Sequence, residues 1–171
     1  PPPPPPPPPR PHFSSRRRHT RWNCSSRGLG DVYKRQGKYL GRTMVSLDFD
    51  RDGAIDLLIG HLDKPVALLS NQTRSDGQWI QIELVGTDTE RDAIGTRVEV
   101  TAGGESFTHW VTAGDGYLCT DEPVLDFGLG AGREVEKVEV VWPRGGKQTF
   151  DRLTRGHRYL IIEGESEAFA R

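Results

Sequence analysis

The chain has 171 residues, enough for one domain of ordinary size or one domain with a fragment of another. Its 20 glycines and 13 prolines favour an all-β protein, no run reaches the roughly 18 apolar residues of a membrane-spanning helix, and two cysteines, Cys24 and Cys119, exclude a disulfide framework. The formal net charge of −1 conceals an asymmetry, because residues 1–36 carry +7 and the remainder carries −8.

Residues 1–36 have an unusual composition. Nine prolines open the segment, and a proline run favours a polyproline II rod that builds no packed core. The runs S-S-R-R-R-H-T-R-W (14–22) and D-V-Y-K-R-Q (31–36) resemble translated sequencing-adapter DNA. The alternative is a basic, proline-rich tail that binds RNA or an SH3-like groove. We exclude this segment from fold prediction and expect the native N-terminus, with any signal peptide, to be missing.

An acidic loop follows at residues 48–56, with the sequence D-F-D-R-D-G-A-I-D. Ca²⁺ takes six to eight oxygen ligands from aspartates, backbone carbonyls and water, and a glycine at the sixth position allows the sharp turn. The D-x-D-x-D-G spacing therefore predicts a Ca²⁺ site, and a solvated turn is the alternative. The predicted ligands are the side chains of Asp48, Asp50, Asp52 and Asp56 and the carbonyl of Ala54.

The flanks of this loop predict strands, not the helices of an EF-hand. Residues 44–47 and 55–59 are short and rich in β-branched and aliphatic residues, and Ile59 stands where an EF-hand has its bidentate Glu. A calcium loop between two strands, D-x-D-x-D-G-x-x-D-L, resembles an FG-GAP/VCBS repeat of a β-propeller. The resemblance implies that residues 37–74 are part of one blade, whose partners would be the missing blades of the same chain.

Beyond residue 75 the sequence predicts a second module. Apolar residues alternate with polar ones in several short segments, and Gly-rich turns separate these segments. This pattern predicts a small antiparallel β-sandwich over residues 75–165, with 166–171 as a tail. The expected strands are 79–85, 97–101, 106–112, 123–127, 135–142, 147–150 and 158–163.

Five motifs in this module carry a second resemblance: R-D-A-I-G-T-R-V (91–98), G-D-G-Y-L (114–118), F-G-L-G (127–130), V-E-V-V-W-P (138–143) and Q-T-F (148–150). In order and spacing they are similar to the ASPIC/UnbV domain, which typically follows FG-GAP/VCBS repeats. The pairing resembles the cartilage-acidic-protein-like family. The resemblance implies a secreted or surface protein associated with calcium binding and adhesion, without a defined enzymatic reaction.

Catalytic and nucleotide-binding patterns are weak. His109 and His157 are isolated, which favours surface or strand positions over metal ligation. Glycoside hydrolysis needs two suitably placed carboxylates, for which Asp115, Asp121 and Glu122 are the candidates. We expect no catalysis from them.

The remaining residues singled out by the sequence are predicted to be structural. The aromatic side chains are expected mainly in the core, with a sugar-stacking face as the alternative. They are Trp79, Trp110, Tyr117 and Trp142. Arg91 and Asp92 are expected to shape the turn into Gly95 through an ion pair or an Asx-type hydrogen bond. Cys119 is expected to be a small, half-buried residue.

The sequence thus predicts a non-enzymatic, calcium-binding module of the extracellular space or cell envelope. Its expected role is adhesion or protein–protein interaction, with an unknown protein or glycan partner and no nucleic acid. The alternatives are a carbohydrate-binding or glycoside-hydrolysing accessory domain and an RNA-binding basic tail on a β scaffold.

Overall fold

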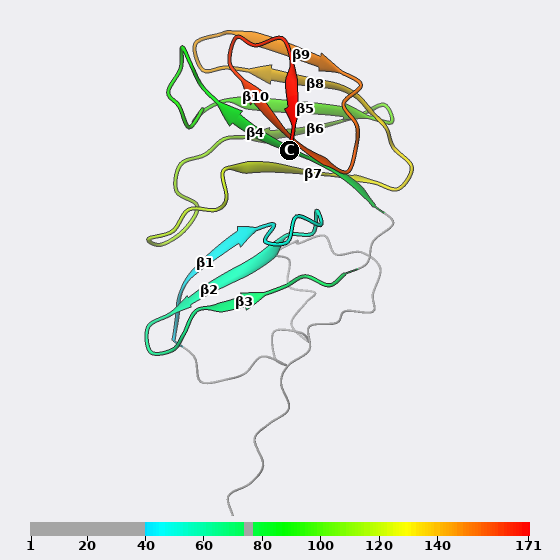
Figure 1. Cartoon of the computed structure of the whole chain (residues 1–171). Coiled ribbons are helices and arrows are strands. Elements are labelled where there is room, and N and C mark those ends of the chain that lie inside the picture. The colour runs from blue at the N-terminus through cyan, green and yellow to red at the C-terminus, as the bar shows by residue number, and fades with distance from the viewer. Residues whose placement is uncertain (1–39, 74–76) are drawn as a thin grey trace, which may run out of the picture.

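The computed structural model describes residues 40–73 and 77–171, so the predictions for residues 1–36 lie outside it. Within these ranges the chain forms eleven strands in three sheets and no helix, which confirms the all-β prediction (Figure 1). Among the described residues there is consequently no helix of the length and hydrophobicity that a membrane crossing requires.

The first sheet contains three antiparallel strands in the order β1-β2-β3. These are β1 (Gly41–Leu47), β2 (Asp56–His61) and β3 (Ala67–Leu69). Leu47 pairs with Asp56, so residues 48–55 are the connection of a β1–β2 hairpin. We call residues 48–56 the aspartate loop. The predicted placement of this loop between two strands is confirmed.

The other eight strands form two four-stranded sheets packed face to face, in the orders β11-β10-β4-β7 and β6-β5-β8-β9. Their bounds are β4 (Gln78–Val85), β5 (Arg97–Ala102), β6 (Glu105–Trp110), β7 (Val124–Gly130), β8 (Val135–Val141), β9 (Lys147–Asp151), β10 (His157–Ile162) and β11 (Ala168–Ala170). Alternate residues of most strands meet in one apolar core, which includes Ile80, Ile82, Val98, Val138, Val140 and Ile161, all with no exposed surface. The β-sandwich prediction is confirmed.

Two features of the sandwich differ from the sequence prediction. The expected tail contains β11, which pairs with β10 and is only three residues long, too short for an alternating pattern to reveal it. In addition, β10 pairs with β4 in parallel. Two neighbouring parallel strands must be joined by a long crossover connection. In agreement with this, β4 is the first strand of the module and β10 is close to its end.

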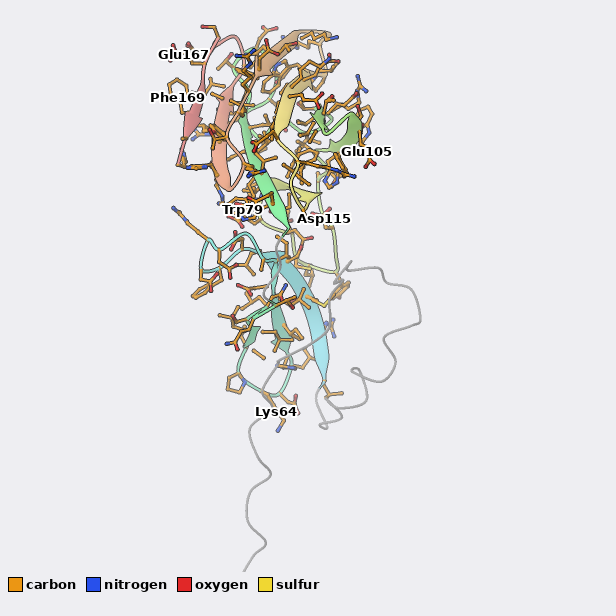
Figure 2. All side chains as sticks on the ribbon, turned by 90° about the vertical axis from the view of Figure 1, so that its right-hand side faces the viewer. Lys64, Trp79, Glu105, Asp115, Glu167 and Phe169 are labelled. Carbon is orange, nitrogen blue, oxygen red and sulfur yellow. The ribbon has the colours of Figure 1, made fainter. Side chains whose placement is uncertain are left out.

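The outer face of β4 is covered near its start. Period-2 alternation sends Ile80 and Ile82 into the core and Gln81 to the opposite face, where solvent is expected. Gln81 is nevertheless 1% exposed. The three-stranded sheet lies beside this end of the sandwich, and the side chain of Trp79 lies there too, whereas Glu167 and Phe169 lie at the far end (Figure 2). The aspartate loop is the element that buries Gln81, as its contacts show.

Candidate metal site

The aspartate loop brings three carboxylates together. Oxygen atoms of Asp48, Asp50 and Asp52 lie within 4.8 Å of one another. Asp48 is 4% exposed, while Asp50 and Asp52 are exposed. This is the arrangement that the D-x-D-x-D-G spacing predicts, and it brings hard oxygen donors from three side chains close to one another.

The hairpin is shaped by hydrogen bonds to the first aspartate. Asp48 Oδ1 accepts a hydrogen bond from the backbone N–H of Asp52 at 3.1 Å, and Oδ2 accepts one from Gly53 at 3.0 Å. Arg51 and Gly53 adopt left-handed backbone conformations, with φ of 62° and 84°. Glycine reaches this region without steric cost, and the chain thereby folds back on the Asp48 carboxylate.

The other two predicted ligands have different surroundings. Asp56 is 1% exposed, and its carboxylate accepts hydrogen bonds from the backbone N–H groups of Phe49 and Asn71. It ties the loop to the end of β3, and it does not join the three-carboxylate cluster. The N–H of Ala54 donates to Asp52 Oδ1 at 2.8 Å. Ligation by Asp56 and by the carbonyl of Ala54 stays a prediction.

The electrostatics of the loop suit a cation. Among residues 40–73 and 77–171, no Lys or Arg side chain forms an ion pair with Asp48, Asp50 or Asp52. Burial raises the pKa of Asp52, against the lowering effect of the Ala54 hydrogen bond, and repulsion from Asp50, Asp48 and Asp56 raises the pKa further. The donor set is therefore all oxygen and negatively charged, as Ca²⁺ prefers.

The loop packs directly on the sandwich at Gly53. A methyl group added to Gly53 would collide with the indole ring of Trp79, the second residue of β4. The glycine is thus required twice, for its left-handed backbone and for the close approach of the indole.

A row of polar side chains crosses the outer face of the sandwich beneath the loop. Arg158, Gln81 and Asp126 stand side by side on β10, β4 and β7 by strand register. Arg158 Nε donates to Gln81 Oε1 at 2.9 Å, and Gln81 Nε2 donates to Asp126 Oδ1 at 2.7 Å. The same Nε2 donates to Asp48 Oδ2 at 2.8 Å. The sequence analysis missed this row, although an uncharged Gln between two core isoleucines is a weak signal of a covered outer face.

Glu122 closes a ring of hydrogen bonds around the first aspartate. Arg158 Nη1 donates to Glu122 Oε1 at 2.6 Å, and the backbone N–H of Asp48 donates to Glu122 Oε2 at 3.2 Å. Arg158 Nη2 is buried and has no partner among the described residues. Both the side chain and the backbone of Asp48 are therefore held by residues of the sandwich.

A second contact runs along the edge of β1. The segment 111–123, which joins β6 to β7 and which we call the strap, follows this edge. Ser46 N donates to Asp121 Oδ1 at 2.8 Å, and Glu122 N donates to Ser46 O at 3.2 Å. Cys119 Sγ, half-buried as expected, contacts Met44 O at 3.4 Å. The strap thus satisfies polar groups that an edge strand would otherwise expose.

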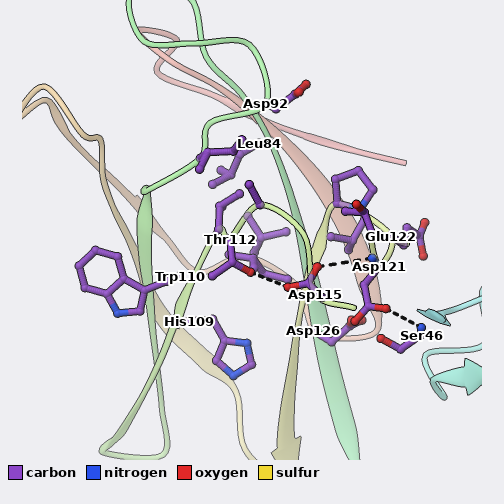
Figure 3. A pocket seen from close by; sticks show the side chains of 18 of the residues that line it. Ser46, Leu84, Asp92, His109, Trp110, Thr112, Asp115, Asp121, Glu122 and Asp126 are labelled. Atoms are coloured by element: carbon purple, nitrogen blue, oxygen red, sulfur yellow. Dashed lines mark hydrogen bonds between the residues drawn. The ribbon is translucent and has the colours of Figure 1, made fainter. Parts of the chain in front are cut away.

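A pocket of about 750 Å³ lies between the strap and the sandwich. The carboxylates of Asp115, Asp121, Glu122 and Asp126 line one side of it, and Trp110 lies on the other side (Figure 3). Asp115 accepts a hydrogen bond from Thr112 Oγ1 at 2.8 Å. The three carboxylates named from sequence therefore share one pocket, and each of them accepts hydrogen bonds that hold the strap in place.

The aromatic residues divide between core and surface. Trp142 is 2% exposed, as predicted. For Trp110 and Tyr117 the prediction was wrong, because their side chains are 57% and 59% exposed. Tyr117 belongs to the strap, where its hydroxyl accepts a hydrogen bond from Arg42 at 2.8 Å. Its position outside any strand explains why strand alternation did not bury it.

The isolated histidines and the turn before Gly95 were also subjects of prediction. His109 and His157 are exposed strand residues, as expected. The turn before Gly95 is held differently from the prediction, because Glu90 supplies both acceptors: its carbonyl for Ala93 N and its carboxylate for Ile94 N. Within the described residues, Arg91 and Asp92 form no side-chain hydrogen bond or ion pair there.

Comparison with known proteins finds relatives of the sandwich domain. Residues 86–168 match the family model described as ASPIC and UnbV. The chain is homologous to cartilage acidic protein 1. It is 30% identical to the Homo sapiens protein over 138 residues, which is 78% of this chain and 20% of that protein. The identities to the Mus musculus and Xenopus tropicalis proteins are 32% and 31% over 120 residues, which is 68% of this chain and 18% of each relative.

The expected ASPIC/UnbV domain and the expected resemblance to cartilage acidic protein are thereby confirmed. The chain spans about a fifth of the length of the curated relatives it matches. Glu122, Asp126 and Arg158, which support the aspartate loop, lie within the matched ASPIC/UnbV segment, and β4 with Gln81 precedes that segment.

Gly53→Ala tests the contact between the aspartate loop and Trp79. An alanine there must adopt a left-handed conformation, which costs about 1–2 kcal/mol, and must displace the indole, which adds roughly 1–3 kcal/mol. Gly104→Ala is the matched control, because Gly104 also has a positive φ but no atom within 4 Å of the added carbon. We expect a larger loss of unfolding free energy for Gly53→Ala, with a shift in tryptophan fluorescence. Equal losses would show that the indole contact is unimportant.

The pH dependence of stability tests Asp126. Burial raises the pKa of this carboxyl to about 6, with further raising by Glu122 and Asp48 and lowering by Gln81 and Arg158. The folded state therefore binds a proton more tightly than the unfolded state, and the free energy of unfolding falls as pH rises from about 4 to 6. In chelator, Asp126→Asn should flatten this decline and stabilise the protein at pH 7.5. A variant that follows the wild-type pH curve would contradict the assignment.

Proposed function

We propose that the aspartate loop binds Ca²⁺ and that the ion has a structural role, locking the β1–β2 hairpin. One observation carries the proposal: three carboxylates within 4.8 Å of one another, without an ion-paired Lys or Arg among the described residues. Asp48, Asp50 and Asp52 would hold the ion through their carboxylates, and Ca²⁺ would supply the positive charge that offsets their repulsion. Ala54 and Asp56 are the further candidates of the sequence analysis.

We also propose that the three-stranded sheet is part of an FG-GAP/VCBS blade that precedes an ASPIC/UnbV domain. The β1–β2 hairpin with its D-x-D-x-D-G loop supports this, as does the homology to a much longer relative. Strands of a blade are covered by neighbouring blades. The exposed apolar residues of this sheet, Met44 and Leu68, and of its β2–β3 connection, Leu62 and Val66, are where such neighbours would pack.

The proposed biological role is adhesion or protein–protein interaction outside the cell or in its envelope, without enzymatic activity. Homology to cartilage acidic protein 1 supports the location. Loop sites of extracellular modules bind Ca²⁺ with dissociation constants on the order of 10⁻⁴–10⁻³ M, which suits a compartment with millimolar calcium.

Thermal unfolding of the full chain tests calcium binding. At 10 mM Ca²⁺ the free ion would exceed such a dissociation constant about 10- to 100-fold, which stabilises the folded state by roughly 1.4–2.7 kcal/mol. We expect Tm to rise by several degrees relative to EDTA. Asp50→Ala should remove most of this gain.

Asp50 suits the test because it is exposed and has no hydrogen-bond or ion-pair partner among the described residues, so that the variant should match the wild type in EDTA. Asp63→Ala, which changes an exposed aspartate outside the loop, is the control and should keep the gain. Equal melting curves of the wild type in calcium and in EDTA would overturn the proposed metal site.

Carbohydrate binding is a second candidate, favoured by the exposure of Trp110 beside a pocket that carboxylates line. An exposed indole offers a stacking face to a sugar ring, and carboxylates accept hydrogen bonds from its hydroxyl groups. The pocket carboxylates are occupied by strap hydrogen bonds, which favours binding over hydrolysis.

A glycan array in EDTA tests this candidate. Calcium-independent binding of a neutral glycan should be abolished by Trp110→Ala, because the stacking face is lost. Phe169→Ala, which removes a 43% exposed aromatic at the far end of the sandwich, should leave binding intact. Absence of any bound glycan in the wild type would eliminate the candidate.

A further inference from the structure

Gln81 lies on the face of β4 that points away from the core, where side chains are normally exposed to solvent. Its neighbours Ile80 and Ile82 fill the core, and its own side chain points away from the core yet is 1% exposed. A buried side-chain amide that lacks partners costs roughly 1–3 kcal/mol. Each polar atom of the Gln81 amide has a partner: Nε2 donates to the carboxylates of Asp48 and Asp126, and Oε1 accepts a hydrogen bond from Arg158.

The partners of Gln81 belong to two different units. Asp126 and Arg158 belong to the sandwich, whereas Asp48 is the first residue of the aspartate loop. Since Asp48 Oδ2 accepts from Gln81 Nε2 at 2.8 Å, the amide fixes the orientation of a carboxylate that also faces Asp50 and Asp52. An amide is the suitable group here, because it is neutral and offers two donors to two carboxylates that repel each other.

Arg158 secures the same aspartate by a second route. Its guanidinium joins Gln81 to Glu122, and Glu122 accepts the backbone N–H of Asp48. The Arg158 side chain is 10% exposed, and its 2.6 Å contact with Glu122 is a charge-assisted hydrogen bond of the strong kind. Gln81 thus holds the Asp48 carboxylate and Glu122 holds its backbone N–H, and Arg158 bonds to both of these residues.

We propose that Gln81 and Arg158 are positioning residues that couple cation binding in the aspartate loop to docking of the three-stranded sheet on the sandwich. The inference rests on the proposed function of the loop. A loop whose first carboxylate is held in place loses less freedom when the ion binds, so affinity is higher in the docked state. By reciprocity, the ion strengthens docking by the same factor.

Two observables separate this coupling from a general effect on stability. One is the calcium dissociation constant, measured by isothermal titration calorimetry on the full chain. The other is hydrogen exchange at the amides of Ser46, Asp48 and Glu122, which donate across the interface and not within the loop. In the wild type, Ca²⁺ should slow exchange at these three amides.

Gln81→Met is the main variant, because methionine keeps the length of the side chain and removes its hydrogen bonds. We expect the calcium dissociation constant to rise about tenfold, within the 10- to 100-fold range typical of residues that orient metal ligands. The protection that Ca²⁺ confers on the interface amides should disappear. Glu122→Gln breaks the ring from its other side and serves as the second variant if Gln81→Met fails to fold.

Glu163→Gln is the matched control. The Glu163 carboxylate accepts hydrogen bonds from the backbone N–H groups of Thr87, Asp88 and Thr89, so its loss weakens the sandwich away from the loop. It should lower Tm and leave the calcium dissociation constant unchanged.

The outcomes separate the two proposals. A wild type that binds no Ca²⁺ overturns the metal site and the coupling together. A wild type that binds Ca²⁺, with unchanged affinity and unchanged calcium protection in folded Gln81→Met and Glu122→Gln, overturns the coupling alone. An equal loss of affinity in Glu163→Gln would likewise overturn it, since global destabilisation would then explain the effect.

Discussion

The two carboxylates of Asp48 and Asp126 meet on one neutral amide, that of Gln81, and the placement of the aspartate loop depends on this contact. Two like charges near one another in a buried place repel strongly, and the shared donor together with Arg158 offsets that repulsion. Burial raises the pKa of Asp126 to about 6, and the charges of Glu122 and Asp48 raise it further against the lowering effect of Gln81 and Arg158. The junction between the two units therefore combines these polar contacts with the packing of Gly53 on the Trp79 indole, while the apolar core stabilises the sandwich separately.

Local pattern was sufficient to predict most of the sandwich. Alternation in 79–85 and 135–142 identified β4 and β8, because one face of each is packed and the other is not. The same pattern could not reveal that the outer face of β4 is also covered at Gln81 and Trp79. That burial comes from a loop more than two dozen residues upstream, and alternation within a strand carries no information about such a partner.

The aspartate loop shows the same division between local and distant causes. The spacing of Asp48, Asp50 and Asp52 fixes their proximity, since a tight hairpin places alternate side chains on one side. Asp56 has the right spacing too, and its carboxylate also accepts hydrogen bonds from Phe49 N and Asn71 N, the second of which comes from the segment after β3. Tyr117 and Trp110 were misjudged for a related reason, because aromatic character predicts burial only where a packed neighbour exists.

The parallel pairing of β4 with β10 has a consequence for biosynthesis. Gln81 and Arg158 are 77 positions apart, so at about 5–20 residues per second the ribosome needs roughly 4–15 s to produce the second after the first. During that interval the hairpin and its aspartates have already been made, and the guanidinium that completes their support has not. The nascent chain therefore passes through a stage in which the acidic turn lacks the Arg158 guanidinium.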